Sequence, residues 1–333
     1  MLIKLFRQDR PTALFLLPVL LLLLWPGIGS TGMLASAREL LAGVPKGMPL
    51  YTPIRALIGI APWMALVLGV LLVLGLSHRL DSSANDAELF DRRNHMPALL
   101  FPVLLALMPR GMVPGPAFMG AWAILWALMR TWTAMGRMNL LSRLFDAGLL
   151  MGIAGLFYLP FSFLIVVLWA TLAVNRPFHW REYVLPLLGL GVVLFLGWGI
   201  CHFIDPELWD PIGSMRALVP AAPPMELHWM YRLLGMVVLG ILLIATVFTF
   251  YSVYSRSVMR VKNMRASLLA FVFAMGLLAL FAWWLTDQVP PVLVAMPAAV
   301  LLSFPFLQAR RIAWAEAGVW ALLALALWGR WVG

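Results

Sequence analysis

The sequence predicts an all-α fold, a polytopic bundle of transmembrane helices. Of the 333 residues, 63% are hydrophobic and only 11% are charged, whereas soluble domains are about half apolar and about a quarter charged. The apolar residues form long runs from near the N-terminus to the end of the chain, and most charges lie in the short stretches between those runs. These observations exclude a water-soluble globular enzyme, a disordered tail and a fibrous repeat.

The apolar runs divide the chain into eleven candidate spans, because a helix needs about 20 apolar residues to cross the hydrocarbon core of a bilayer. In chain order they are residues 12–28, 57–77, 95–109, 115–135, 147–158, 161–174, 184–204, 230–254, 267–285, 291–307 and 313–331. The first run follows basic residues, as in a signal peptide, but it lacks a small-x-small cleavage site and reads as a retained helix. We therefore expect a single integral membrane domain over residues 1–333, with no separate soluble domain.

The positions of the basic residues predict a cytoplasmic N-terminus. With that orientation, sixteen of the 24 basic residues lie on the cytoplasmic side: Lys4, Arg7, Arg10, Arg79, Arg92, Arg93, Arg137, Arg143, Arg176, Arg181, Arg256, Arg260, Lys262, Arg265, Arg310 and Arg311. Seven lie on the other side: Arg38, Lys46, Arg55, Arg110, Arg216, Arg232 and Arg330. Cytoplasmic loops of membrane proteins carry this excess of Lys and Arg. The net charge of +10 is thus an orientation signal, and no nucleic-acid partner is expected.

The segments 147–158 and 161–174 are too short to cross a bilayer comfortably. Arg143 and Arg176 flank them, and both are expected in the cytoplasm, so the chain must leave and return between these residues. The apolar run is broken near Pro160. We expect a short half-helix pair near 147–174, either two tilted spans or a re-entrant hairpin covered by neighbouring helices.

The small residues and the histidines of the chain predict packing rather than metal chemistry. Gly148, Gly152 and Gly155 have the small-xxx-small spacing that lets membrane helices approach closely.

The histidines lack the spacing of a zinc or haem site, and each lies at a predicted membrane boundary, which favours an interfacial role. They are His78, His95, His179, His202 and His228. No metal and no cofactor are expected.

Acidic residues gather in one predicted exterior loop, around residues 205–229. The four acids of this loop are Asp205, Glu207, Asp210 and Glu226. Carboxylates beside tryptophans can hold a divalent cation or accept a proton from a sugar hydroxyl. The same prolines and tryptophans are equally typical of a loop that lies on the lipid headgroups. Both interpretations remain open.

Several stretches resemble an uncharacterised bacterial family of polytopic inner-membrane proteins, known only as a domain of unknown function. The stretches are Ser142–Pro160, Asn175–Tyr183, Met48–Tyr51, Asn94–Leu99 and Ala315–Glu316. More distantly, the chain is similar to membrane glycosyltransferases that use polyprenyl-phosphate sugars. That similarity rests on the half-helix pair, the Arg-Pro turn at Arg176, the cytoplasmic N-terminus and the number of spans.

The second resemblance implies roles for a few exterior residues. Such enzymes carry an acidic pair or a single catalytic Asp or Glu early in the first exterior loop, and here that loop offers only Glu39. Glu39 is then the candidate catalytic base. Arg38, Arg55 and Arg232 are candidates for binding the lipid phosphate, since a guanidinium matches phosphate oxygens bidentately. The acidic loop is a possible cation site.

Three function classes follow from the sequence. The first is a cell-envelope transferase for glycan or lipid-linked sugar, and the second is a transporter or flippase for a lipid or small solute. The third is a non-catalytic scaffold subunit of an envelope complex, which would dock through the basic segment Arg256–Arg265. The expected location is the bacterial cytoplasmic (inner) membrane. The expected partners are membrane lipids, including a polyprenyl-phosphate lipid, or other envelope membrane proteins.

Overall fold

The structure is a computed structural model, and all its regular secondary structure is helical within the residues that it describes. These are residues 2–7, 12–24, 48–61, 63–108, 111–134, 140–176, 178–205, 209–211, 229–309 and 311–332. The α-helices are α1 (Leu2–Arg7), α2 (Thr12–Leu24), α4 (Tyr51–Ile60), α5 (Trp63–Asp86), α6 (Met96–Ala106), α7 (Pro116–Ala134), α8 (Leu140–Phe157), α9 (Ile165–Asn175), α10 (Trp180–Ile204), α12 (Trp229–Ser255), α13 (Met259–Thr286), α14 (Pro291–Gln308) and α15 (Ile312–Val332). A 3-10 helix, η1 (Leu159–Leu164), precedes α9.

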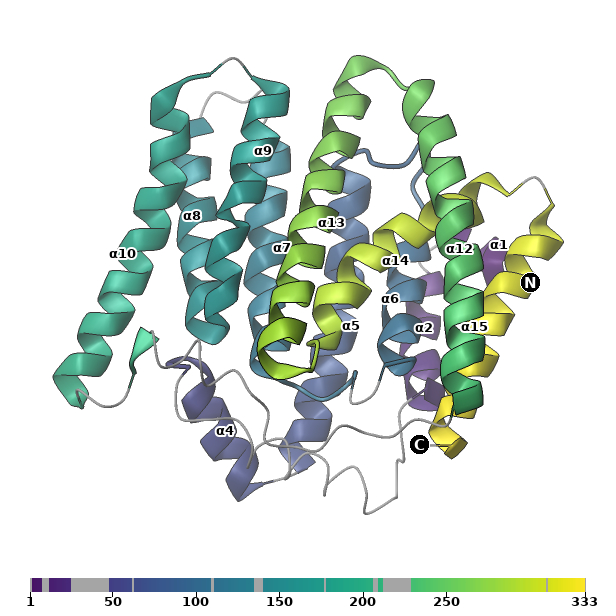
Figure 1. Cartoon of the computed structure of the whole chain (residues 1–333), viewed down its shortest axis with the longest axis horizontal. Helices are drawn as coiled ribbons and strands as arrows, with labels where there is room; N and C mark the ends of the chain where they lie inside the picture. The colour runs from purple at the N-terminus through teal and green to yellow at the C-terminus, as the bar shows by residue number, and fades with distance from the viewer. Residues whose placement is uncertain are drawn as a thin grey trace.

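Each of the eleven predicted segments contains helix, although 57–77 is divided between α4 and α5, and 161–174 falls on η1 and α9. Seven helices, α5, α8, α10, α12, α13, α14 and α15, are long and apolar enough to cross a membrane. The helices run side by side in one bundle (Figure 1). The protein is therefore a polytopic helical membrane protein, as the sequence predicts.

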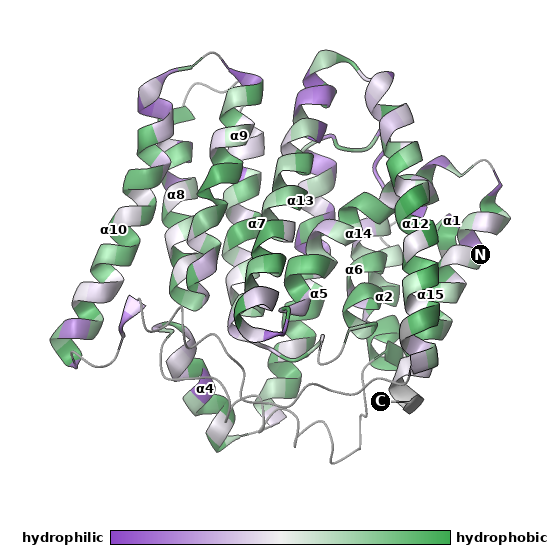
Figure 2. Ribbon diagram, viewed as in Figure 1, coloured by the Kyte–Doolittle hydropathy of each residue, from purple (hydrophilic) through white to green (hydrophobic). Residues whose placement is uncertain are grey.

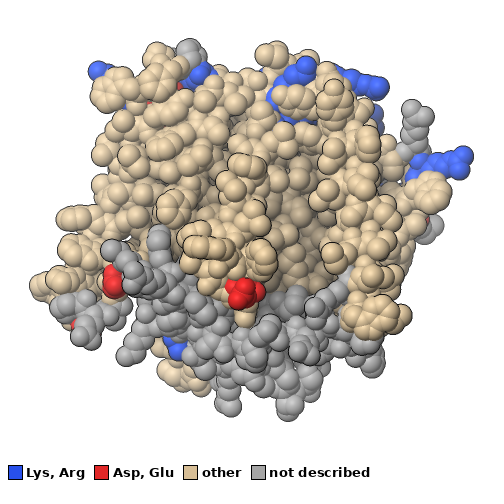
Figure 3. Space-filling model, viewed as in Figure 1, with Lys and Arg blue, Asp and Glu red and all other residues tan. Residues whose placement is uncertain are grey.

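The two ends of the bundle differ in charge. The turns that follow α9 and α12 lie at one end, which we call the basic end (Figure 1). Lys and Arg gather there in the space-filling view (Figure 3), and the ribbon changes from apolar to hydrophilic at the same turns (Figure 2). Helix α4 and the turns that follow α8 and α13 lie at the other end, which we call the opposite end. The segregation of charge in space follows the segregation seen in the sequence.

Helices α6 and α14 form the centre of the core. All residues of α6 from Met96 to Leu105 are buried, and α14 packs along α6. Both helices contain internal prolines, Pro102 in α6 and Pro297 and Pro305 in α14. Proline is tolerated inside membrane helices because neighbouring helices satisfy the freed backbone groups.

Glycines bring α8 and α10 into backbone contact, which confirms the packing predicted from their spacing. A Cβ atom on Gly148 would collide with the carbonyl of Pro186, and one on Gly152 would lie 2.6 Å from Cβ of Val193. From the other side, a Cβ on Gly189 would lie 2.5 Å from a backbone oxygen of α8. Only residues without a side chain allow this approach.

The structure differs from the expected short half-helix pair in the first half of that pair. Helix α8 begins at Leu140 instead of residue 147 and is 18 residues long, so it is a full-length helix. The polar residues Ser142, Arg143 and Asp146 end the apolar run without ending the helix, because a hydropathy pattern reports the lipid environment and not the backbone conformation. The break near Pro160 is present as expected, but the second half begins with the 3-10 helix η1 before the short helix α9. Gly155 lies against Ser162 of η1 at this break.

The second predicted span, 57–77, is displaced toward the C-terminus. Its first residues belong to α4, which ends before Ala61 (φ −131°, ψ 87°). A residue that precedes proline is disfavoured in the helical region, and Pro62 follows Ala61 in the sequence. Helix α5 then continues to Asp86, beyond the apolar run. The extra turns carry the polar residues of the site described next.

The basic N-terminal segment is docked into the bundle. Ile3 and Phe6 of α1 are fully buried. Nη2 of Arg7 donates a 2.7 Å hydrogen bond to the carbonyl of Leu307 at the end of α14. The segment is thus part of the packed bundle.

Candidate functional site

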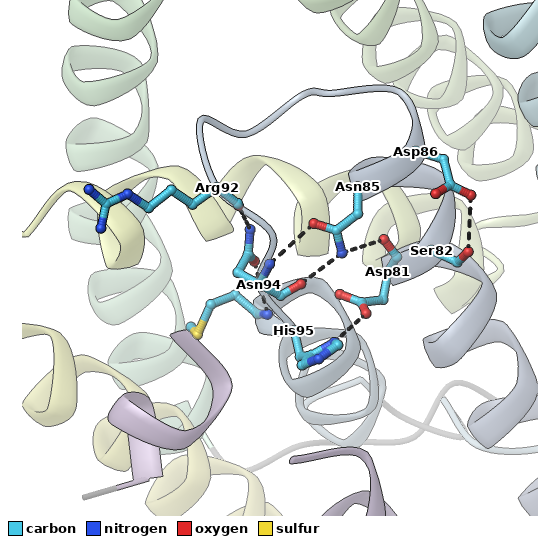
Figure 4. Close-up of polar contacts among 8 residues, drawn as sticks. Asp81, Ser82, Asn85, Asp86, Arg92, Asn94 and His95 are labelled. Atoms are coloured by element: carbon cyan, nitrogen blue, oxygen red, sulfur yellow. Dashed lines mark hydrogen bonds and ion pairs between the residues drawn. The ribbon is translucent and has the colours of Figure 1, made fainter. Parts of the chain in front are cut away.

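A buried polar network joins α5 to the start of α6 at the basic end (Figure 4). At its centre, Nδ1 of His95 and Oδ2 of Asp81 are 2.7 Å apart. Asp81 is 2% exposed and His95 is 9% exposed. The amide of His95 donates a 2.8 Å hydrogen bond to the carbonyl of Phe6, which connects the network to α1.

The helical repeat of α5 places Asp81 toward the core. Val73, Ser77, Leu80 and Ala84 are buried on the same side of the helix, and Asp81 is four residues after Ser77 and one after Leu80. Residues three and four apart share a helix face. The chain therefore directs a carboxylate into the bundle, where burial requires a partner, and the His95 imidazole meets that requirement.

Two asparagines connect the turn between the helices to α5. The side chain of Asn85 accepts a hydrogen bond from the Asn94 amide (3.2 Å) and donates to the Asn94 carbonyl (2.8 Å) and the Asp81 carbonyl (3.0 Å). The Asn94 side chain donates to the carbonyl of Arg92 and accepts from the amide of Met96, both at 3.1 Å. These asparagines bond chiefly to main-chain groups, so they hold the α5–α6 turn in one conformation.

A buried arginine holds the same turn from the other side. Arg265 of α13 is 1% exposed. Its Nε donates to the carbonyl of Leu89 (3.0 Å), its Nη2 to Oδ1 of Asp91 (2.9 Å), and its Nη1 to the carbonyl of Val253 (3.1 Å) and to the hydroxyl of Ser257. The guanidinium thus ties the turn to the apex where α12 and α13 meet.

Sequence reasoning placed His95 at the membrane boundary as an interfacial residue. The structure corrects this, since the His95 side chain is buried and pairs with the buried Asp81. The missed signal is the position of Asp81 on the core face of a helix that extends past the apolar run. A buried acid–base pair of this kind can hold a proton between two groups.

A second cluster forms at the opposite end, where segments far apart in the sequence pack together. Met48, Tyr51, Leu156, Cys201 and Trp209 are all buried in it. The backbone amide of Leu50 donates a 3.4 Å hydrogen bond to the carbonyl of Leu156. The burial of Cys201 agrees with a role as a small apolar filler.

Tyr51 anchors α4 to this cluster. Its phenol donates a 3.0 Å hydrogen bond to the carbonyl of Pro114. Burial raises the pKa of Tyr51 to about 12, and the nearby Arg55 opposes this only partly. The phenol is therefore neutral at physiological pH and acts as a donor. The buried indole Nε1 of Trp209 has no hydrogen-bond partner among the described residues.

The structure brings together some of the predicted site residues. Arg55 is half-buried on α4, one turn after Tyr51, while Asp210 directly follows the buried Trp209. Asp205 is exposed at the end of α10. Segments around residues 48–55 and 205–211 therefore meet at the opposite end. Four predicted residues lie outside the described residues: Arg38, Glu39, Glu207 and Glu226.

Arg232 lies in the first turn of α12, near the opposite end, and its side chain is outside the described part of the structure. Glu316 is half-buried in the second turn of α15. Across the described residues, no three His, Cys, Asp or Glu side chains come together in a way that would hold a metal ion.

No protein family matches the sequence, and no curated protein and no solved structure shows significant similarity to the chain. Its function has to be inferred from its own residues.

Proposed function

We propose that the protein is an eleven-pass protein of the bacterial inner membrane, with a cytoplasmic N-terminus, that acts on a polyprenyl-phosphate-linked sugar at the outer face. The observation that carries this proposal is the packing of Trp209 with Met48 and Tyr51, which joins the two exterior loops. The basic end then faces the cytoplasm, in agreement with the positive-inside rule.

The charges beside this cluster suit a lipid phosphate and a hydroxyl acceptor. Arg55 supplies a guanidinium, which recognises phosphate oxygens bidentately. Asp205 and Asp210 supply exposed carboxylates on the neighbouring loop. In this arrangement the guanidinium binds the lipid phosphate, and the carboxylates accept hydrogen bonds from the hydroxyl groups of the sugar.

Helix α4 supports an interfacial substrate. Leu57 and Ile60 are exposed on it, 52% and 82% respectively, although the helix lies at the end of the bundle. An amphipathic helix with an exposed apolar face is typical of segments that lie in the headgroup region. We infer that α4 borders the outer leaflet, where a lipid-linked sugar is presented.

In the proposed transfer, Glu39 removes the proton of the acceptor hydroxyl as general base. The hydroxyl oxygen bonds to the anomeric carbon of the sugar. The bond from that carbon to the phosphate oxygen breaks, and the polyprenyl phosphate leaves with the electron pair. Arg55, with Arg38 and Arg232, offsets the charge of the leaving phosphate.

Lipid binding by the full chain in detergent tests the proposal. We expect polyprenyl phosphate to bind more tightly than the uncharged polyprenol, and Arg55→Ala to weaken phosphate binding about tenfold, the effect of losing one charged contact of about 1.4 kcal/mol. Arg181→Ala, at the basic end, is the matched control and should bind as the wild type does. Equal binding of phosphate and alcohol, or an unaffected Arg55→Ala, contradicts the proposal.

Catalysis is tested separately with Glu39→Gln. This variant should keep the lipid affinity of the wild type and lose transfer of sugar from a polyprenyl-phosphate donor to an acceptor. Full transfer by Glu39→Gln would rule out Glu39 as the base.

Alkaline-phosphatase fusions test the orientation. A fusion after Pro49 should be active and a fusion after Ser257 should be inactive, because the enzyme folds only outside the cytoplasm. The reverse pattern contradicts a cytoplasmic N-terminus.

Proton-coupled transport is the second candidate function, and the buried Asp81–His95 pair favours it. Ionisable groups inside a membrane protein are frequent members of proton pathways. In proteoliposomes under a pH gradient, a transporter would take up protons with its solute, and Asp81→Asn would abolish that uptake. Sugar transfer without proton movement favours the first candidate.

A further inference from the structure

Helices α12 and α13 form the two sides of a V-shaped groove. They are joined by a short turn at the basic end and held there by Arg265, which bonds to the Val253 carbonyl and to Ser257. Below this apex, each helix packs against α14, and the two make little contact with each other. The space-filling view shows the surface hollowed between these two helices (Figure 3).

Apolar residues line the α13 side of the groove. Arg265 marks the side of α13 that faces α12, and helical spacing places Leu269, Val272, Gly276 and Leu280 below it on the same side. Leu269 is 43% exposed and Leu280 is 60% exposed. A Cβ atom on Gly276 would meet no atom within 4 Å, so the space beside it is open.

The floor of the groove is formed by α14. This helix is mostly buried, but Val294 is 38% exposed, and Ala298 and Leu301 are half-buried. The three positions lie four and three residues apart and so form one stripe. Since α12 and α13 cover α14 on either side, the stripe faces the opening between them.

The apex of the groove is basic. Arg256 and Arg260 are exposed in and after the turn, and Lys262 is half-buried three residues before Arg265, on the same side of α13. Of the acids near the apex, Glu88 pairs with Arg260 and Asp91 with Arg265. Arg256 and Lys262 remain as an excess of positive charge where the apolar groove closes.

We propose that this groove binds one anionic phospholipid of the leaflet at the basic end. An acyl chain lies along the stripe of α14 between the two helices, and the phosphate lies at the apex near Arg256 and Lys262. An apolar channel that closes at a basic apex complements the two parts of such a lipid, and basic residues at the membrane surface favour anionic headgroups. This site lies at the other end of the bundle from the proposed sugar-lipid site and does not depend on it.

Native mass spectrometry of the full chain tests the proposal, with phosphatidylglycerol and phosphatidylcholine added in separate titrations. We expect one phosphatidylglycerol to be retained, with phosphatidylcholine bound at least about tenfold more weakly. Gly276→Leu should fill the groove and abolish this binding. Gly191→Leu is the matched control, because Gly191 of α10 also has open space around it but lies outside the groove.

A second pair of variants tests the headgroup contact without changing the groove. Arg256→Ser combined with Lys262→Ser should weaken phosphatidylglycerol binding about tenfold, whereas Arg181→Ser, in the first turn of α10, should not. Equal retention of the two lipids would overturn the proposal. Binding of phosphatidylglycerol at the wild-type level by Gly276→Leu or by the double variant would also overturn it. The same holds if Gly191→Leu loses as much binding as Gly276→Leu does.

Discussion

The indole Nε1 of Trp132 donates a 2.8 Å hydrogen bond to the hydroxyl of Ser267, 135 residues away in the sequence. The same hydroxyl bonds to the hydroxyl of Thr171. The three residues come from α7, α13 and α9 and are all buried. One serine thus connects three helices in the apolar interior.

Replacing this serine should destabilise the bundle. Ser267→Ala leaves the Trp132 N–H buried without an acceptor, and a buried unsatisfied donor costs about 1–3 kcal/mol. Ser303→Ala is the control, because the Ser303 hydroxyl only bonds back to the carbonyl of Ala299 in its own helix. Unfolding in mixed micelles measures both. Equal stabilities of the two variants would show that the hydrogen bonds of Ser267 to Trp132 and Thr171 contribute nothing to the stability of the bundle.

Removing one member of the buried acid–base pair should also destabilise the fold. Asp81→Ala leaves His95 buried without its hydrogen-bond partner, and an unsatisfied buried polar group costs about 1–3 kcal/mol. Asp86→Ala, one turn later and exposed, should change the free energy of unfolding by less than about 0.5 kcal/mol. The Asp81→Ala/His95→Ala double variant should lose less than the sum of the single losses, since the residues interact directly. Additive losses would argue against that interaction.

Side chains added at the α8–α10 contact should separate the two helices. Gly148→Ala places a Cβ against the carbonyl of Pro186, a backbone atom that cannot rotate away, and such overpacking costs about 1–3 kcal/mol. Gly191→Ala on the open face of α10 should instead stabilise by up to about 1 kcal/mol, because alanine favours the helix. The same unfolding assay distinguishes them. A Gly148→Ala protein as stable as the wild type would contradict the close contact.

The raised pKa of Tyr51 predicts that the folded protein loses stability at alkaline pH. Because burial raises its pKa to about 12 from the ordinary 10.0, the folded state favours the protonated phenol. The resulting stabilisation is complete below pH 10 and declines as the pH rises from 10 to about 12. Tyr51→Phe should show a smaller alkaline decline than the wild type, and at neutral pH it should lose about 1 kcal/mol with the bond to Pro114.

The control for this pH dependence is Tyr251→Phe, because Tyr251 is 73% exposed on α12. That variant should keep the alkaline decline of the wild type. If Tyr51→Phe declines in the same way, another group is responsible.

The helices were predictable because lipid imposes one strong condition on the sequence. A segment that crosses hydrocarbon must be apolar over its length and must satisfy its own backbone hydrogen bonds. All eleven predicted segments accordingly contain helices. Their ends were predicted less well, as at α5 and α8, because a helix continues through polar residues once it leaves the hydrocarbon.

The polar contacts were less accessible to sequence reasoning. Asp81 and His95 are only 14 residues apart, yet their pairing depends on how the α5–α6 turn folds back over α1. Trp209 and Tyr51 meet because α8 and α10 end beside α4, and no local pattern specifies that. Contacts between distant segments depend on packing geometry, which composition and periodicity do not contain.

The sequence by itself determined that this is a polytopic helical membrane protein, where its helices lie and which glycines allow close packing. The reason is that hydropathy, charge and small-residue spacing act locally along a helix. Only the tertiary structure decided which polar groups are buried together, that Trp209 packs in one cluster with Met48 and Tyr51, and that α12 and α13 diverge over α14. Those features arise because helices far apart in the chain must pack against each other, and buried polar groups such as Asp81 and Ser267 then bond to partners on neighbouring elements.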